Sequence, residues 1–401
     1  MRATPSLGKS FSPASCLLAV LSLWHGAVLA ETDNPLDLRA VFNSQNDSNL
    51  FRQPAAASNH AAEQVDTATL GLGFKTQQSL QSFGLNVNLV DVHYQNFSYL
   101  NYTATNYSAA WQFAITPQVR GNLSSNSQET LNSYADVQKN TTRLLNTNRT
   151  SRVDARYGVE GPWSVSVGLT QSLQSSQRDQ VAGSDFSSTA SDLGVQYQFS
   201  SGTTAGVTTR LTNGQYLNPP AAISTFFDNN FDQVETEVRL HLVVSESKTL
   251  DLHAAQRDVT HPNVSLRNYS GLVTGAEMNW AITGQTVLTG AWAHALDTYQ
   301  AIDANYSQSE RISLGMDWQM LNKLALSLRT DFTNIRYLGG PIPFLQSNRV
   351  DDLSNTSVSL TWSPRKQLTL AASVQSATRA SNLPGVDYAS TLTSLTAQVN
   401  F

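Results

Sequence analysis

The sequence has little charge, one cysteine and no long hydrophobic run. Of its 401 residues only 14% are Asp, Glu, Lys or Arg, whereas a soluble domain usually carries about 25%. The single cysteine, Cys16, excludes a disulfide scaffold. A helical membrane protein would need repeated apolar runs of about 18 residues, and the chain has none. An ordinary soluble domain, a disulfide-rich protein and a helical membrane protein are therefore all disfavoured.

The chain also lacks a basic surplus. Lys and Arg number 25 against 30 Asp and Glu, which gives a net charge of −5. Proteins that bind nucleic acid usually display a basic patch, so we expect no nucleic-acid partner. Charge is replaced by Ser, Thr, Asn and Gln, which make up more than a third of the chain. Disorder is disfavoured because aromatic residues reach 9% and Val, Leu and Ile are plentiful.

The first 30 residues have the pattern of an export signal. Arg2 and Lys9 precede an apolar stretch that ends at Ala30. A charged start, a short apolar core and a small final residue predict a secretory signal peptide over residues 1–30, cleaved between Ala30 and Glu31. The alternative is a buried helix or a membrane anchor, but the apolar run is too short to span a bilayer. The remainder, 31–401, is then a single mature domain.

Apolar and polar residues alternate with a period of two from about residue 35 to the end. In residues 312–320, for example, Ile, Leu, Met and Trp occupy the even positions and polar residues or glycine the odd ones. The segments 234–244, 324–332 and 163–169 follow the same pattern. Such alternation predicts β-strands with one apolar and one polar face.

Short and long connections alternate along the chain. This arrangement is typical of an outer-membrane barrel, in which short periplasmic turns alternate with longer extracellular loops. We therefore predict an all-β fold, a transmembrane antiparallel β-barrel of about 18 strands, with 16 as the fallback. Short turns are expected near 76–79, 116–117, 160–162, 200–203, 245–248, 283–285, 321–323 and 363–367, and long loops near 44–64, 95–101, 135–147, 177–185, 216–228, 260–267, 300–305, 339–350 and 381–387.

Aromatic residues gather at both ends of the predicted strands. Five tryptophans lie close to predicted short turns, and most tyrosines lie near the opposite strand ends. Because amphipathic rings favour the two membrane interfaces, this distribution predicts two aromatic girdles. The tryptophans are Trp111, Trp163, Trp280, Trp318 and Trp362, with Trp292 as a mid-strand exception, and the tyrosines include Tyr94, Tyr99, Tyr134, Tyr216, Tyr269, Tyr299, Tyr306 and Tyr337.

The C-terminus is an alternating segment with an aromatic last residue. Leu395, Ala397, Val399 and Phe401 occupy every second position. This ending is similar to the terminal-strand signal that outer-membrane assembly machinery reads. We therefore expect that machinery and outer-membrane lipid to be partners of the chain, and the bacterial outer membrane to be its location.

The polar strand faces should line an aqueous lumen. A barrel of 16 to 18 strands encloses a water-filled channel unless something plugs it. The many neutral polar residues suit an uncharged solute such as a sugar chain, but they also suit simple solvation of a pore. The charged candidates for the lining are Arg39, Arg120, Asp154, Arg156, Glu235, Glu237, Arg239, His241, Asp251, His253, Asp317, Arg329 and Asp331.

Signals of catalysis are weak. His241 or His253 beside Glu237 or Asp251 is the one arrangement that suggests an acid–base pair. The chain has no HExxH motif, no nucleophile elbow and no metal-ligand spacing among its His residues. We therefore expect a protein that is not an enzyme and that needs no cofactor or metal.

Two loop motifs carry a family resemblance. Residues 46–52 read Asn-Asp-Ser-Asn-Leu-Phe-Arg directly after the opening strand, and residues 96–100 read Asn-Phe-Ser-Tyr-Leu. Together with Tyr134, they resemble the EpsL-type outer-membrane barrels of exopolysaccharide operons, which are porin-like and associated with exosortase systems. The resemblance implies a role in exopolysaccharide biosynthesis or export, with polysaccharide and export-operon proteins as partners. It implies no catalytic or binding residues.

Three functions remain open at this point. The leading hypothesis is a barrel channel that takes part in exopolysaccharide export. The first alternative is a general porin for small hydrophilic solutes, which would share every sequence feature. The second is a structural or adhesion barrel with a plugged lumen, acting through its loops.

Overall fold

The structure is a computed structural model, and it describes residues 35–54, 61–135, 141–176, 185–217, 226–299, 301, 303–342 and 345–401. The predicted signal peptide and its cleavage site between Ala30 and Glu31 lie outside the described residues.

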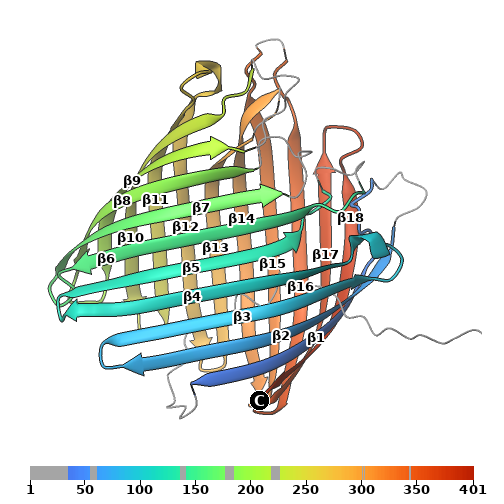
Figure 1. Cartoon of the computed structure of the whole chain (residues 1–401), viewed down its shortest axis with the longest axis horizontal. Helices are drawn as coiled ribbons and strands as arrows, with labels where there is room; N and C mark the ends of the chain where they lie inside the picture. Colours follow the sequence, from blue (N-terminus) through green and yellow to red (C-terminus); the bar gives the residue numbers. More distant parts are fainter. Residues whose placement is uncertain are drawn as a thin grey trace, which may run out of the picture.

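The described chain forms one closed antiparallel β-barrel of 18 strands (Figure 1). Every strand pairs with its neighbours in sequence, and β1 pairs with β18 to close the barrel. The predicted fold class and strand number are confirmed. The strands are β1 (Leu36–Asp47), β2 (Glu63–Gln78), β3 (Gln81–Tyr94), β4 (Tyr102–Thr116), β5 (Val119–Leu131), β6 (Leu145–Tyr157), β7 (Trp163–Ser176), β8 (Phe186–Gln198), β9 (Thr204–Tyr216), β10 (Asn230–Ser245), β11 (Lys248–Thr260), β12 (Tyr269–Thr283), β13 (Thr286–Thr298), β14 (Ala304–Leu321), β15 (Leu324–Gly339), β16 (Val350–Arg365), β17 (Leu368–Ser381) and β18 (Tyr388–Asn400).

Two single 3₁₀ turns, η1 (Ser98–Leu100) and η3 (Ser265–Arg267), lie in the described loops. No helix among the residues described is long and apolar enough to cross a membrane.

The connections at one end of the barrel are short, as predicted. Six of these eight turns contain two residues, and the other two, after β6 and β8, contain five. Gly158 and Gly202 lie in the five-residue turns with φ of 85° and 86°, a conformation that glycine adopts without steric cost. Since the number of strands is even, β1 begins and β18 ends at this same end of the barrel, where the two strands pair antiparallel.

Closure satisfies the backbone where β18 meets β1. Arg39 pairs with Asn400, and the Phe401 N–H donates to the Leu38 carbonyl at 2.8 Å. In hydrocarbon an unpaired N–H or C=O is costly, and a closed barrel leaves no strand edge. The last residues of the chain, Leu395 to Phe401, therefore complete the barrel wall.

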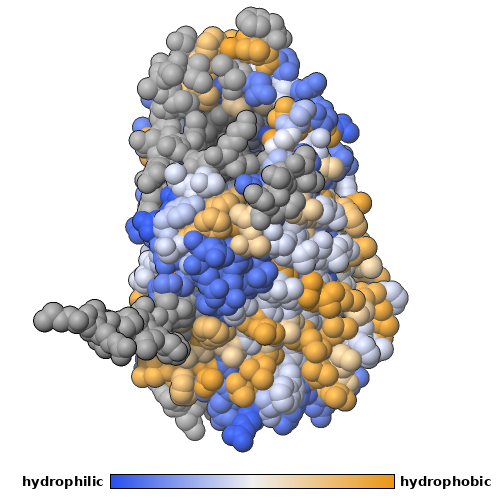
Figure 2. Space-filling view, turned by 90° about the vertical axis from the view of Figure 1, so that its right-hand side faces the viewer, coloured by the Kyte–Doolittle hydropathy of each residue, from blue (hydrophilic) through white to orange (hydrophobic). Residues whose placement is uncertain are grey.

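The outer face of the strands carries large exposed apolar side chains. Leu314, Leu360 and Leu395 are 54%, 41% and 66% exposed, and comparable residues recur on every side of the barrel. Figure 2 shows hydrophobic residues gathered over the lower part of one face. In water such a surface would cost roughly 25 cal/mol per Å² of apolar area, so a contiguous belt of this kind indicates contact with lipid.

The prediction of a tyrosine girdle at the membrane interface is wrong for five of the tyrosines. Tyr94, Tyr134, Tyr216, Tyr269 and Tyr337 are each less than 9% exposed. These tyrosines do lie near strand ends, as the sequence predicts. Position along a strand, however, does not decide which side of the wall a ring occupies. The loops fold back over the inner face near the mouth and bury these rings there. The tryptophans behave as predicted, with Trp163 and Trp362 on the outer face and 61% and 49% exposed.

Candidate functional site: the barrel lumen

The candidate lining residues lie on the inner face, which is the strand face opposite the exposed apolar residues. Directly paired residues of neighbouring strands share a face. On β10, Val234 and Val238 are exposed on the outer face, so Glu235 and the other odd-numbered residues point inward. The same register argument places every candidate on the inner face: Arg39, Arg120, Asp154, Arg156, Glu235, Glu237, Arg239, His241, Asp251, His253, Asp317, Arg329 and Asp331.

Most of these residues form ion pairs along the wall. Arg257 Nε lies 2.6 Å from Glu235 Oε2 on the neighbouring strand. The His241 Nδ1 to Asp251 Oδ1 distance is 2.8 Å, again between directly paired residues. Within β10, Arg239 Nε lies 2.9 Å from Glu237 Oε1.

Further pairs lie on the β14–β15 wall. Arg329 Nη2 is 2.5 Å from Asp317 Oδ2, and Arg311 Nη2 is 2.6 Å from Asp331 Oδ1. Asp331 also accepts a hydrogen bond from the Ser313 hydroxyl at 2.6 Å. The inner wall is thus neutralised locally, arginine by arginine, on strands β10–β15.

Sequence reasoning missed one of the strongly paired groups on the inner face. Arg152 binds Asp192 through two bonds of 2.6 and 3.0 Å and also contacts Asp154 at 3.1 Å. Arg152 has the same parity on β6 as Asp154, and Asp192 alternates with outward Leu193 on β8. The period-two alternation of the sequence was therefore the signal that could have placed Arg152 and Asp192 on the inner face.

The lumen is open to solvent between these pairs. The side chains of Arg239 and Arg311 are 59% and 55% exposed although both point inward, and Asp317 is 47% exposed. A barrel filled by its own side chains would be close-packed and would bury such groups. Water therefore reaches the inner wall.

Near the mouth, by contrast, part of the inner face is apolar and covered. The first mouth cluster comprises Phe51, Val65, Val90, Val92, Tyr94, Leu100, Ala104 and Tyr134, all less than 9% exposed. Phe51 from the first loop packs edge-on against Phe97 and Tyr134, with ring centroids 4.9 Å apart in both cases. Loops after β1, β3 and β5 therefore meet inside the mouth.

The 46–52 motif builds the turn that brings Phe51 inward. Asn49 is 1% exposed; its amide donates to the carbonyls of Gln53 and Ala389 at 2.8 and 3.0 Å, and its oxygen accepts from the Gln53 N–H. Asp47 forms a 2.8 Å ion pair with Arg52, which has φ of 53°. The motif thus forms a buried network of polar contacts that fixes the first loop against β18.

A second group of loops packs on the opposite side of the mouth. The second mouth cluster consists of Tyr216, Phe231, Val259 and Tyr269. Above it, Arg267 is fully buried; its Cζ lies 4.1 Å from the ring centroid of Phe227, and its Nη2 donates to the Ala301 carbonyl at 3.0 Å. Burial lowers the pKa of Arg267 to about 10.

Aromatic residues at 226–231 therefore pack in the loops. Phe227 and Phe231 are 7% and 9% exposed, so they do not form an open stacking surface for sugar rings. Both rings instead pack in the covered part of the mouth, Phe231 in the second mouth cluster and Phe227 against Arg267.

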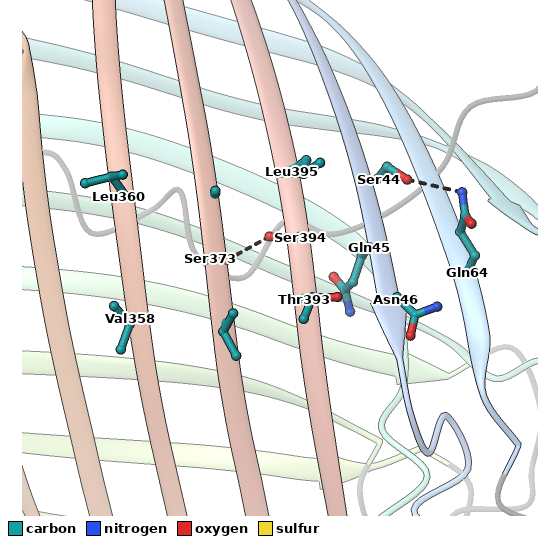
Figure 3. Close-up of a pocket in the computed structure, with 12 residues that line it drawn as sticks. Ser44, Gln45, Asn46, Gln64, Val358, Leu360, Ser373, Thr393, Ser394 and Leu395 are labelled. Atoms are coloured by element: carbon teal, nitrogen blue, oxygen red, sulfur yellow. Dashed lines mark hydrogen bonds between the residues drawn. The ribbon is translucent and has the colours of Figure 1, made fainter.

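Two cavities lie in the described residues near β1. The smaller, about 510 Å³, is at the seam between β18 and β1, and Figure 3 shows Val358, Leu360 and Leu395 beside it together with Ser44. These apolar residues belong to the outer face, so this cavity is a hollow in the lipid-facing surface. The larger, about 920 Å³, lies at the short-turn end of the β1–β6 wall and is lined by inward-pointing polar residues together with apolar residues that include Leu80 and Val159.

Across the described parts of the chain, no group of three or more His, Cys, Asp or Glu side chains is arranged to hold a metal ion.

Comparisons with known proteins point to porins. The family model described as "Putative beta-barrel porin 2" matches residues 254–401, from the second half of β11 to the last residue. No curated protein matches the sequence. Solved structures resemble this chain in fold, at sequence identities of 10% and 11% for the two described next.

Two such structures illustrate it. A BenF-like porin from Pseudomonas fluorescens Pf-5 is 11% identical with a TM-score of 0.53, covering 91% of this chain and 99% of that one. OccK1 (OpdK) of Pseudomonas aeruginosa is 10% identical with a TM-score of 0.52 and the same coverage. This chain therefore has a porin-like β-barrel fold, with a closed 18-stranded wall, an apolar outer belt and a polar inner face.

Proposed function

We propose that the barrel is an outer-membrane channel through which small hydrophilic solutes diffuse. The observation that carries the proposal is the exposure of inward-pointing charges: Arg239, Arg311 and Asp317 face the lumen and yet are about half accessible. An interior that hydrates charged groups also hydrates a passing solute. Outer-membrane lipid against the apolar belt and the outer-membrane assembly machinery are the partners that this function needs.

A solute-permeation assay tests the proposal. Purified barrel reconstituted in liposomes should allow isotonic solutions of small sugars to enter, so that the vesicles swell, and the rate should fall as the sugar grows. Vesicles that swell no faster than protein-free controls, although they hold folded, heat-modifiable barrel, would favour a plugged structural or adhesion barrel.

Participation in exopolysaccharide export is a second candidate. It is favoured by the first-loop motif on which the resemblance to EpsL-type barrels rests, residues 46–52. In this chain the motif shapes the mouth, because Asp47 and Asn49 hold Phe51 over the inner face. A polymer leaving the cell would pass this feature.

Deletion of the gene separates the two candidates. Export predicts a lower level of surface polysaccharide, restored by the wild-type gene on a plasmid. Unchanged polysaccharide in the deletion strain, together with reduced uptake of small solutes, would leave only the general channel.

We infer that the lumen has no catalytic role. The 2.8 Å contact between His241 and Asp251 is of the kind that hydrolases use, but it takes its place in a series of acid–base pairs along the wall. Replacing His241 and His253 by Ala should leave permeation unchanged. A polysaccharide-hydrolysing activity that disappears in these variants would overturn the inference.

A further inference from the structure

Two arginines of the lumen differ from the rest because they face each other. Arg120 on β5 and Arg156 on β6 are directly paired across the two strands, so their Cβ atoms lie roughly 4.5–5.5 Å apart. Both point inward, since the outward positions of the same strands are held by exposed Leu123 and Val153. Like charges directly opposite each other destabilise a sheet.

Neither arginine has a carboxylate partner among the described residues. Elsewhere on the inner wall Arg152, Arg257, Arg311 and Arg329 each lie within 3.1 Å of a carboxylate oxygen. Asp154, the acid nearest in sequence to Arg156 on the same face, is engaged by Arg152 at 3.1 Å. No ion pair within the described residues therefore neutralises either of these two guanidinium groups.

The pair borders the larger cavity. This space of about 920 Å³ is lined by the cations Arg120, Arg156 and Lys75, by the carboxylates of Asp37 and Asp154, and by amide side chains that include Asn86, Gln112 and Asn122. Gln112 and Asn122 are themselves directly paired, next to Arg120 on the same face. Two guanidinium groups thus stand beside neutral hydrogen-bonding groups, in a lining whose three cationic side chains outnumber its two carboxylates.

Guanidinium forks match the geometry of a carboxylate, and bonds of this kind are stronger than neutral ones. Amides bind hydroxyl groups either as donors or as acceptors. We propose that Arg120 and Arg156 form a binding site in the lumen for small hydroxylated carboxylic acids, of the hexuronate class. The carboxylate bridges the two guanidinium groups, and the amides of Gln112 and Asn122 receive the hydroxyls. This deepens the proposed channel function by naming a solute class.

Binding by the full barrel in detergent micelles tests the site directly. Equilibrium dialysis should show that D-glucuronate binds more tightly than D-glucose, which has the same ring without the carboxylate. In Arg120→Gln/Arg156→Gln, affinity for glucuronate should fall by about tenfold or more, the size expected for loss of hydrogen bonds to a charged group. Affinity for glucose should not change.

A matched control removes two arginines that already have partners. Arg311→Gln/Arg329→Gln deletes the same charge from the opposite wall and should retain most of the preference for glucuronate. Arg120→Lys/Arg156→Lys keeps the charge without the forked geometry and should bind with intermediate affinity. Heat-modifiable migration verifies that each variant has folded, and the Gln pair should melt no lower than wild type because repulsion has been removed.

Several results would overturn the proposal. These are equal binding of glucuronate and glucose, an unchanged affinity in Arg120→Gln/Arg156→Gln, an equal loss in the control pair, or tighter binding of glucose 6-phosphate than of glucuronate. Conductance in planar bilayers separates the two inferences. A conducting barrel that does not bind glucuronate contradicts the site but not the channel, and a sealed barrel that binds it contradicts the channel but not the site.

Discussion

At the scale of single residues, the mouth is shaped by a few buried polar side chains. Asn49 bonds to two carbonyls and one N–H, and Asp47 accepts from Asn49 and pairs with Arg52. Such groups are costly to bury unless they are satisfied, and here they are. The position of Phe51, and with it the first mouth cluster, depends on them.

Replacing Asn49 by Ala should release the first loop. The change leaves buried carbonyls and an N–H unpaired, which costs about 1–3 kcal/mol. We expect faster proteolytic cleavage within 48–54 and a wider mouth, seen as a higher conductance. Asn46→Ala is the control, because Asn46 is exposed on the outer face. Equal protease resistance in both variants would show that the polar network around Asn49 does not hold the loop.

The two faces of one strand should respond oppositely to charge. Leu360 lies in the middle of the apolar residues of β16, and Ser359 beside it points inward. Leu360→Arg should lower the free energy of unfolding in bilayers by about 2–4 kcal/mol, the cost of a cation at the midplane on the lipid face. Ser359→Arg should cost far less, as judged by urea titration of the folded fraction. A similar loss in both would mean that the faces are misassigned.

At the scale of elements, the loop after β11 packs against its neighbours through buried side chains. His261 is 2% exposed and stacks on Tyr216, with ring centroids 6.3 Å apart. Asp228 fixes the same loop by accepting from the N–H groups of Asn263 and Val264 at 2.6 and 3.1 Å. The loop after β11 is therefore held by a buried histidine and a buried carboxylate.

Acid should loosen this loop. Burial lowers the pKa of His261 below its ordinary 6.5; nearby Asp228 opposes this shift and Arg267 adds to it. The packed loop thus disfavours a proton that the unpacked loop binds, so its stability is complete above about pH 6.5 and declines as pH falls toward the lowered pKa. Amide protection factors within 261–268 should be smaller at pH 5 than at pH 7.5. His261→Gln should lack this difference, and a pH response that persists in it would point to another group.

The last strand presents its terminal ring to lipid. Phe401 is 75% exposed and contributes one backbone bond to Leu38. Deleting it removes little packing, so the purified variant should refold in detergent nearly as well as wild type. In cells, however, the amount of heat-modifiable barrel in the outer membrane should fall, because the assembly signal has lost its last residue. Normal levels in the membrane would refute that role for Leu395, Ala397, Val399 and Phe401.

At the scale of the whole molecule, alternation was sufficient to predict the barrel. Each strand is half exposed to lipid and half to the lumen, so a period of two in the sequence translates directly into two faces, and the turns follow from its interruptions. The parity of residues such as Glu235 and Arg329 placed them inward for the same reason. These are local properties that a sequence carries explicitly.

The mouth could not be predicted in this way. The burial of Tyr94 and Tyr134 depends on where the loop that carries Phe51 folds, which is a contact between segments far apart in the chain. The same is true of the bond from Arg379 to the Ala135 carbonyl, 244 residues away. Ion pairs such as Arg152 with Asp192 required the register between strands, which alternation does not give. The same holds for Arg120 and Arg156, which have no carboxylate partner among the described residues.

The proposed channel function requires that the 18-stranded wall enclose a continuous aqueous path. Single-channel recording of the purified full barrel in planar bilayers tests it most directly. We expect discrete, long-lived conductance steps in potassium chloride that change in size for Asn49→Ala and are preserved in His241→Ala. Folded, heat-modifiable barrel that inserts without any conductance step would contradict it.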